Sequence, residues 1–325
     1  MAETYGDLVE LRARGELAAW EPAGRPVRTG TWAEQAEPTL DRIARALADG
    51  RHDEAAALVR HLLVEAQEIH DLYTEWVATL PPILEREGGT AQIDDVDTEA
   101  EWQQLRADVD ELALRCASGE VDMYEVDALA GRWLVAHDRH RDLVARWLDL
   151  IADRLGEERL GEVWAELQAT GIASYARYDL AQSPWARSQA LLVQIAIEGM
   201  HGHLGGPGRR GAVEVREHDD RVELRFSPCG SGGVIRARDA LGVTRARHDF
   251  AWNELGVCHY CIHCCVLQQL TPIDRLGFPA RVIEPPLRPG DPCSWSVYRD
   301  PSLVPEEAYR RVGREKPDEV GGRDG

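Results

Sequence analysis

Apolar side chains recur at three- and four-residue steps through the first 204 residues, which is the pattern of amphipathic helices. In the clearest case, residues 52–80, one apolar stripe is formed by Val59, Leu62, Ala66, Ile69, Tyr73, Trp76 and Leu80. Pro81 and Pro82 follow directly, and proline lacks the N–H that a helix interior needs, so the pattern predicts that this helix ends there. Further helices are predicted over 99–116, 121–155, 160–167 and 185–204.

The pattern changes after Gly205-Gly206-Pro207-Gly208, where apolar and polar residues begin to alternate. Residues 212–217 and 221–226 alternate on either side of Asp219-Asp220, which predicts a β-hairpin. Further short strands are predicted over 234–238, 281–283 and 295–298. The predicted fold class is α+β, an N-terminal mainly helical bundle followed by a smaller β-containing, Cys-rich metal-binding domain. The predicted parts are a helical domain at 1–204, a Cys-rich domain at 205–312 and a disordered tail at 313–325.

The formal net charge of −20 is unevenly distributed. Residues 205–325 carry 18 basic and 18 acidic side chains, so residues 1–204 carry the whole excess of acid. An acidic surface repels phosphate groups, which argues against nucleic acid or an anionic membrane as partner. Apolar runs are short and no apolar leader is evident, so we expect a cytoplasmic protein. Lys316 is the one lysine, a bias typical of a GC-rich bacterial genome, and it leaves little scope for Schiff-base chemistry.

The most informative motif is Cys-His-Tyr-Cys-Ile-His-Cys-Cys at 258–265, which holds four of the seven cysteines. In a reducing compartment, so dense a group of thiols indicates a metal site or thiol chemistry. Three thiols stand at C-x2-C-x2-C spacing, and zinc prefers four such ligands in a tetrahedron. We therefore predict a zinc site formed by Cys229, Cys258, Cys261 and Cys264.

The sequence leaves several residues open as the fourth ligand. Cys229 is favoured because Gly230 follows it and because it lies just after the predicted hairpin. The alternatives are Cys265, Cys293, His259 and His263. The same spacing is also the core of a ferredoxin-type iron–sulfur motif, but the usual continuation to a fourth cysteine and a proline is missing. A distal Cys293 would complete such a cluster. Zinc is the predicted cofactor and an iron–sulfur cluster the alternative, with a purely structural zinc as the simplest interpretation of the motif.

Two histidines interrupt the apolar stripe of the 121–155 helix. His137 and His140 are three residues apart and share one face with Trp133 and Val144. His70 lies at the edge of the stripe of the 52–80 helix. Buried histidines that are hydrogen-bonded within a core would explain this pattern. Alternatively, His137, His140 and His70 line a polar pocket in the bundle, where imidazoles bind a substrate or move protons.

A third interpretation, a carboxylate-bridged di-iron bundle, needs two Glu-x-x-His units on separate helices. Glu68-Ile69-His70 has the wrong spacing for such a unit, so this interpretation is disfavoured.

Together these patterns predict a bacterial metalloenzyme with hydrolase- or lyase-type chemistry on a small polar molecule. Its active site would lie where the bundle histidines meet the Cys-rich domain. The alternative is a non-enzymatic ligand- or partner-binding protein with a structural zinc, and a third class is an iron–sulfur redox or sensor protein. The sequence does not specify an oligomeric state.

Overall fold

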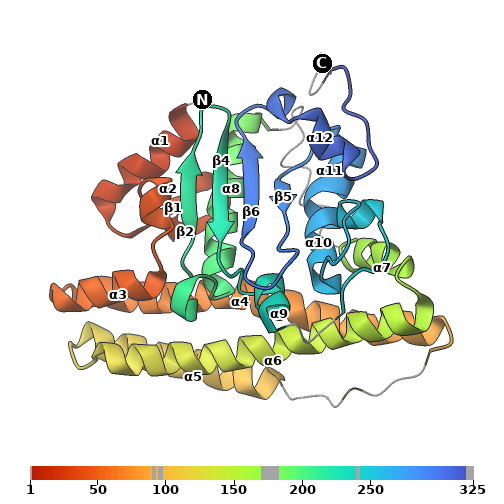
Figure 1. Cartoon of the computed structure of the whole chain (residues 1–325). Coiled ribbons are helices and arrows are strands. Elements are labelled where there is room, and N and C mark those ends of the chain that lie inside the picture. The colour runs from red at the N-terminus through yellow and green to blue at the C-terminus, as the bar shows by residue number, and fades with distance from the viewer. Residues whose placement is uncertain (1, 90–92, 94–97, 170–182, 239–241, 320–325) are drawn as a thin grey trace.

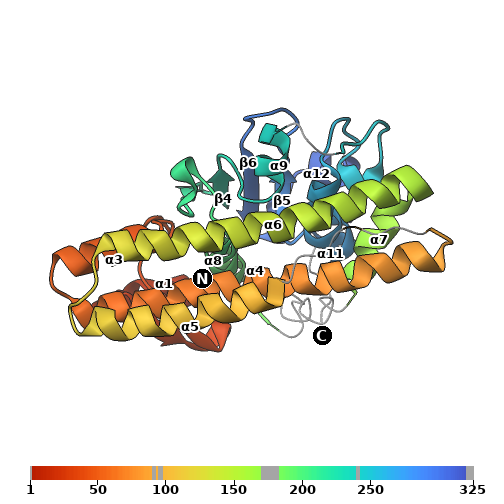
Figure 2. The same cartoon turned by 90° about the horizontal axis from the view of Figure 1, so that it is seen from below.

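The protein mixes helix and sheet, as predicted, in a computed structural model that describes residues 2–89, 93, 98–169, 183–238 and 242–319. Figures 1 and 2 show three long helices side by side, α4, α5 and α6, with a four-stranded sheet standing on this layer and α8 lying against the sheet. The helices of the first part are α1 Ala2–Leu11, α2 Trp32–Gln35, α3 Thr39–Ala48, α4 His52–Arg86, α5 Thr98–Ala117, α6 Met123–Leu155, α7 Arg159–Leu167 and α8 Trp185–Gly202.

The second part combines strands with short helices. Its helices are α9 Gly232–Arg238, α10 Ile262–Cys265, α11 Thr271–Leu276 and α12 Glu306–Arg310. The strands of the chain are β1 Leu17–Trp20, β2 Arg25–Arg28, β3 Glu214–Glu217, β4 Arg221–Phe226, β5 Val282–Glu284 and β6 Cys293–Tyr298. The predicted hairpin is confirmed as β3 and β4, and the last two predicted strands as β5 and β6. The small β1–β2 hairpin near the N-terminus was not predicted.

Helix α4 does not end before its two prolines, so that prediction is wrong. The helix runs through Pro81 and Pro82 to Arg86, and Ile83 and Leu84, just beyond them, are each 1% exposed. Burying a large aliphatic side chain stabilises a fold by roughly 1.5–3 kcal/mol. Two such side chains contribute roughly 3–6 kcal/mol, which is of the same order as a penalty of about 3 kcal/mol for each of the two prolines, so burial explains why the helix persists.

The strand predicted over 234–238 is also wrong, because these residues belong to helix α9. Val234 and Ile235 are both buried, whereas a strand would place two consecutive side chains on opposite faces. The amide of Val234 donates to the carbonyl of Cys229, and the amide of Ile235 donates to that of Ser231. These local bonds close a helical turn immediately after the cysteine loop.

The large sheet is antiparallel with strand order β3-β4-β6-β5. On β4, Val222, Leu224 and Phe226 are buried and the residues between them are more exposed, as the alternating sequence predicts. Phe226, the last residue of β4, pairs with Cys293, the first residue of β6. The loop that leaves β4 and carries Cys229 therefore begins beside Cys293.

One hydrophobic core crosses the boundary predicted at 204/205. It joins side chains of α4, α6 and α8 to side chains of β4, β6 and α10, and a second core lies between α3, α4, α5 and α6. The division into separately folding domains stays a prediction. Within the tail predicted to be disordered, Arg314 pairs with Asp274, and Lys316 donates to the carbonyls of Ser302 and Val304. Residues 320–325 lie outside the described residues.

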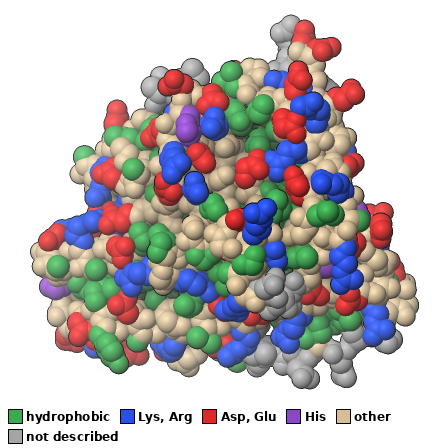
Figure 3. Space-filling model, in the orientation of Figure 1, with side chains coloured by type: hydrophobic (Ala, Val, Ile, Leu, Met, Phe, Trp, Pro, Cys, Tyr) green, Lys and Arg blue, Asp and Glu red, His purple; other side chains and the backbone are tan. Residues whose placement is uncertain are grey.

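The surface mixes charges of both signs. On the face drawn in Figure 3, acidic and basic side chains are interspersed over the helices and the sheet, although the chain as a whole is strongly acidic. Among the described residues, none of the helices is both long enough and apolar enough to cross a membrane.

A buried ion network joins the N-terminal hairpin to α4 and α8. We call it the Arg28 network; its members, each at most 4% exposed, are Arg28, His61, Glu65, Glu198 and His201. His201 Nδ1 lies 3.1 Å from Glu65 Oε1, and His61 Nε2 lies 3.3 Å from Glu198 Oε1. Arg28 is hydrogen-bonded to His201 and lies 3.8 Å from Glu65.

The Arg28 network contains a Glu-x-x-His unit that the sequence search missed, Glu198-Gly199-Met200-His201. Opposite it on α4 stand His61 and Glu65, four residues apart. The guanidinium of Arg28 lies beside His201 and Glu65, and Arg25 pairs with Glu198 at 2.5 Å, so two arginines supply positive charge to the network. The unit is therefore part of an internal ion network.

We predict that Glu198 makes stability depend on acid pH. Burial raises its pKa, but the hydrogen bond and charge of His61 and the charge of Arg25 outweigh burial and bring the pKa to about 2. A lowered folded-state pKa contributes stability that is present above about 4.5 and lost as pH falls towards 2, roughly 3 kcal/mol in all. In urea unfolding, the stability advantage of wild type over Glu198→Gln should shrink as pH falls from 5 to 3. Glu21→Gln, on an exposed side chain, should show no such trend, and a pH-independent advantage would contradict the assignment.

Candidate functional site

Four thiols line one buried cavity, which we call the thiol cavity. Its polar lining residues are Cys229, Ser231, Tyr260, Cys261, His263, Cys264 and Cys293. Its walls are completed by Trp252, Ile283, Trp295 and the two prolines at 285 and 286. The cavity encloses about 10 Å³, room for about one water-sized group. Three of the four predicted metal ligands thus face one space, together with the alternative ligands Cys293 and His263.

Strand pairing and a helical turn bring these thiols together from three places in the sequence. The register of β4 against β6 places the loop of Cys229 beside Cys293. Cys261 ends a single 3₁₀ turn, His259–Cys261, and Cys264 lies in α10, so the C-x2-C spacing turns both thiols to the same side. The indole N–H of Trp164 donates to the carbonyl of His259 at 3.0 Å and ties this segment to α7.

Two glycines allow the cysteine loop to approach its neighbours. A Cβ at Gly230 would lie 1.9 Å from the carbonyl oxygen of His203, and a Cβ at Gly232 would lie 2.1 Å from Sγ of Cys261. Any side chain at these positions would displace either the backbone after α8 or the thiol itself. The glycines of the 229–233 stretch therefore serve close packing around the cavity.

The remaining candidate ligands lie outside the cavity lining. Cys258 is 1% exposed, and its thiol is hydrogen-bonded with that of Cys261. The thiol of Cys265 faces the carbonyl of Asp249 at 3.5 Å. His259 is hydrogen-bonded through Nδ1 to Asp149 at 2.8 Å. In the described part of the chain, no three His, Cys, Asp or Glu side chains are arranged so that they could hold a metal ion. The predicted metal site stays a prediction.

Burial keeps most thiols of the cavity protonated. It raises the pKa of the Cys264 and Cys293 thiols well above the ordinary value. The pKa of Cys261 is raised first by its hydrogen bond with Cys258 and then by burial, while the same hydrogen bond lowers the pKa of Cys258. His263 donates from Nδ1 to the carbonyl of Tyr260 at 2.7 Å, which leaves Nε2 as an acceptor 3.3 Å from the sulfur of Cys264.

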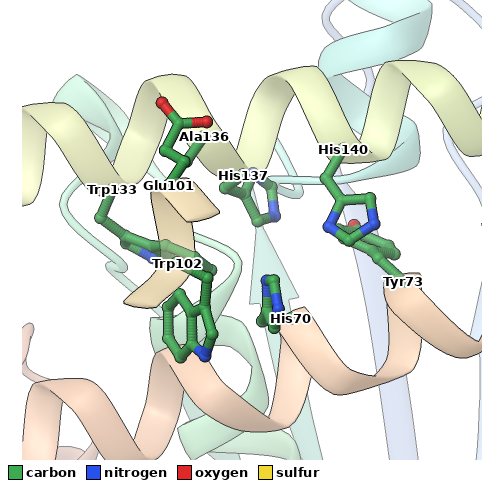
Figure 4. A pocket seen from close by; sticks show the side chains of 8 residues that line it. All are labelled: His70, Tyr73, Glu101, Trp102, Trp133, Ala136, His137 and His140. Carbon is green, nitrogen blue, oxygen red and sulfur yellow. The ribbon is translucent and has the colours of Figure 1, made fainter. Parts of the chain in front are cut away.

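A second pocket lies between α4, α5 and α6, and we call it the histidine pocket. It is lined by His70, Tyr73, Glu101, Trp102, Trp133, Ala136, His137 and His140, and it encloses about 10 Å³. Figure 4 shows His137 and His140 pointing from α6 towards His70 and Tyr73 on α4, with Trp102 and Trp133 at one end. All three histidines predicted as candidates thus line one pocket. Their catalytic role stays a prediction.

Helical spacing explains how these side chains meet. His70 and Tyr73 are three residues apart on α4, and His137 and His140 are three apart on α6, so each pair shares a face. The ring of Trp102, from α5, stacks on His70 with centroids 4.4 Å apart.

Burial keeps the imidazoles of the histidine pocket neutral. It lowers the pKa of His137 and of His140 to about 4, and that of His70 to a smaller extent. Neutral imidazole is both a hydrogen-bond donor and an acceptor, so the pocket is polar without being cationic.

A chain of buried hydrogen bonds connects the two pockets. Tyr260, in the wall of the thiol cavity, donates from its hydroxyl to that of Tyr73 at 3.0 Å. The hydroxyl of Tyr73 lies 3.2 Å from Nδ1 of His203, which lies 3.1 Å from Nε2 of His137. Nδ1 of His137 lies 3.1 Å from the carboxylate of Asp138. The tertiary fold thus joins the bundle histidines to the cysteine segment through two tyrosines.

The sequence analysis did not identify either tyrosine as part of a site, and it named Cys293 as an alternative ligand. Tyr73 is one position of the apolar stripe on α4, and Tyr260 lies between two cysteines of the 258–265 motif. A tyrosine in each motif was the available signal, because a buried tyrosine hydroxyl needs a hydrogen-bond partner.

The anchor of this arrangement is Asp138, which is hydrogen-bonded to His137 of the histidine pocket. Burial raises its pKa, but the hydrogen bonds of His137 and Arg209 and the charge of Arg141 outweigh burial and hold the pKa well below its ordinary value. Arg141 also donates to the carbonyl of Gly230 at 3.1 Å, next to Cys229. Arg141, paired with Asp138 on the same helix, therefore holds α6 against the cysteine loop.

No protein-family model, no curated protein and no solved structure matches the chain. Functional inference therefore starts from the residues of the two pockets.

We predict that Gly232→Ala expels the thiol of Cys261 from the thiol cavity. The added methyl group would meet Sγ at 2.1 Å, and cysteine has a single side-chain torsion with which to yield. Overpacking of this kind destabilises a fold by about 1–3 kcal/mol, which urea unfolding would measure. Gly131→Ala on α6 is the control, since nothing lies within 4 Å of its Cβ, and it should stabilise the fold by up to about 1 kcal/mol. Equal stability of the two variants would contradict the packing around Cys261.

Proposed function

We propose that the protein is a metal-dependent enzyme in which thiols of the thiol cavity hold a zinc ion and the histidine pocket receives a small polar substrate. One observation carries the proposal: Tyr260 of the thiol cavity donates to Tyr73 of the histidine pocket at 3.0 Å. A metal centre and a group of neutral imidazoles would then lie on either side of one hydrogen bond.

The chemistry of the ligands supports zinc. Thiolates bind Zn²⁺ strongly, and the ion replaces the protons that burial otherwise retains on the sulfurs. The thiols line a common cavity, so ligation requires the cysteine side chains to turn towards one point. Cys229, Cys261 and Cys293 are the most buried of the four, and Cys264 is partly exposed.

A catalytic zinc site holds three protein ligands and keeps a fourth position for water or substrate. Zinc does not change its oxidation state, so the proposed reaction is of the hydrolase or lyase type. In this arrangement Cys229, Cys261 and Cys293 would hold the ion. His263 lines the same cavity, and its acceptor nitrogen, 3.3 Å from the sulfur of Cys264, would be the group that accepts a proton there.

An iron–sulfur protein is the second candidate, and the lining of the thiol cavity favours it specifically. Cys293 joins Cys229, Cys261 and Cys264 there, which makes four cysteines around one space. Four thiolates are the usual ligand set of [2Fe–2S] and [4Fe–4S] clusters. Such a protein would be coloured, whereas a zinc protein would be colourless.

We predict that the protein, purified under anaerobic conditions without added metal, contains about one zinc per chain by elemental analysis. Cys229→Ser and Cys293→Ser should each lower the zinc content, because both thiols line the thiol cavity. Cys265→Ser is the matched control, because this cysteine neighbours Cys264 but its thiol faces Asp249. It should keep the zinc. Cys258→Ser tests the ligand set predicted from the sequence against the set with Cys293.

The outcomes separate the candidates. Iron with visible absorption in place of zinc would favour the iron–sulfur protein, and no metal in the wild-type protein would contradict both. Equal metal loss in Cys265→Ser and Cys293→Ser would mean that the cavity does not define the site. Thermal unfolding of the variants would then distinguish a structural zinc, whose loss unfolds the chain, from a catalytic one.

A further inference from the structure

His140 is a buried polar side chain without a hydrogen-bond partner in the part of the chain that the structure describes. It is 3% exposed, and its ring faces His70 and Tyr73, with centroids 5.4 and 5.6 Å away. Figure 4 shows that it points into the histidine pocket. Buried polar groups are nearly always hydrogen-bonded, so this imidazole is available to a bound molecule.

Hydrogen-bond directions along the buried chain can be worked out from Asp138. Because Asp138 is ionised, its oxygen only accepts, so Nδ1 of His137 carries the hydrogen. His137 is neutral, which makes its Nε2 an acceptor. Nδ1 of His203, 3.1 Å away, must therefore carry a hydrogen and donate to it.

Among the described residues, these directions leave the hydroxyl hydrogen of Tyr73 without an acceptor. Nδ1 of His203 already carries a hydrogen, so it cannot accept from Tyr73. The hydroxyl of Tyr260 donates to the oxygen of Tyr73. Tyr73 lines the histidine pocket and stays protonated because burial raises its pKa. The pocket thus offers one O–H donor and one unpartnered imidazole.

The lining of the histidine pocket disfavours an anionic ligand. Burial keeps its imidazoles neutral, and Glu101, at its edge, contributes a negative charge that is paired with Arg139 at 2.9 Å. The enclosed volume of about 10 Å³ admits one oxygen-sized group. A carboxylate or phosphate would lose its hydration and find no cation among the lining side chains.

We propose that the histidine pocket binds the oxygen of a neutral carbonyl or amide compound, with Tyr73 and the imidazole of His140 both donating a hydrogen bond to that oxygen. The proposal deepens the proposed function, on which it rests for identifying this ligand as the substrate. The binding itself does not require the metal.

Acetamide and acetate form a matched pair of probes, because they share size and shape and differ in charge. Each is titrated into the full-length protein, and the ring proton resonances of His140, assigned with His140→Phe, are followed by NMR. Acetamide should shift these resonances at concentrations at which acetate does not. Tyr73→Phe should weaken acetamide binding by roughly 3- to 10-fold, the effect of losing one neutral hydrogen bond.

Tyr309→Phe is the control, because it removes another buried tyrosine hydroxyl far from the pocket, one that donates to the carbonyl of Gly277. It should bind acetamide as the wild type does. Acetate binding as tightly as acetamide, or acetamide binding that Tyr73→Phe and His140→Phe leave unchanged, would overturn the proposal. The same titration of Cys293→Ser separates this proposal from the proposed metal site. If the variant lacks metal and still binds acetamide in preference to acetate, ligand binding in the histidine pocket is supported independently of the thiol cavity.

Discussion

The close contact between Gly230 and the backbone of His203 is the constraint on which both pockets depend. It lets the end of α8 and the loop after β4 approach so closely that Gly230 tolerates no larger residue. On one side, it holds His203 between Tyr73 and His137. On the other, it fixes Cys229 in the wall of the thiol cavity. Arg141 strengthens the same junction through the carbonyl of Gly230. The two pockets are thus parts of one packed unit.

The spacing of apolar residues predicted most of the fold, because most helices and strands form by burying one apolar face. The apolar stripes of α4 and α6 and the alternation of β4 correspond to side chains that are buried in the structure. The exceptions arose where tertiary burial outweighed local preference, as for Ile83 and Leu84 beyond the prolines. At Val234 and Ile235, hydrogen bonds to the preceding loop stabilise a helix instead of the predicted strand. Neither effect can be judged from a short window of sequence.

The candidate site was predictable to the extent that it follows helix faces. His137 and His140 interrupt an apolar stripe, and they do line a pocket with His70. The partners across the fold were not predictable in the same way. That Cys293 stands beside Cys229 follows from the register of β4 against β6, and strand register depends on the whole sheet. The contact between Tyr73 and Tyr260 joins residues 187 positions apart, and a single sequence carries no signal for such a pair.

Arg28 gives the N-terminal half a cation of its own. Two helices there present a pair of glutamates and a pair of histidines, a composition that elsewhere would attract a metal ion. The guanidinium, fully buried among them, is covalently part of the chain and cannot be removed by a chelator. A chelator therefore leaves this ionic core intact, because its cation is a side chain of the protein itself.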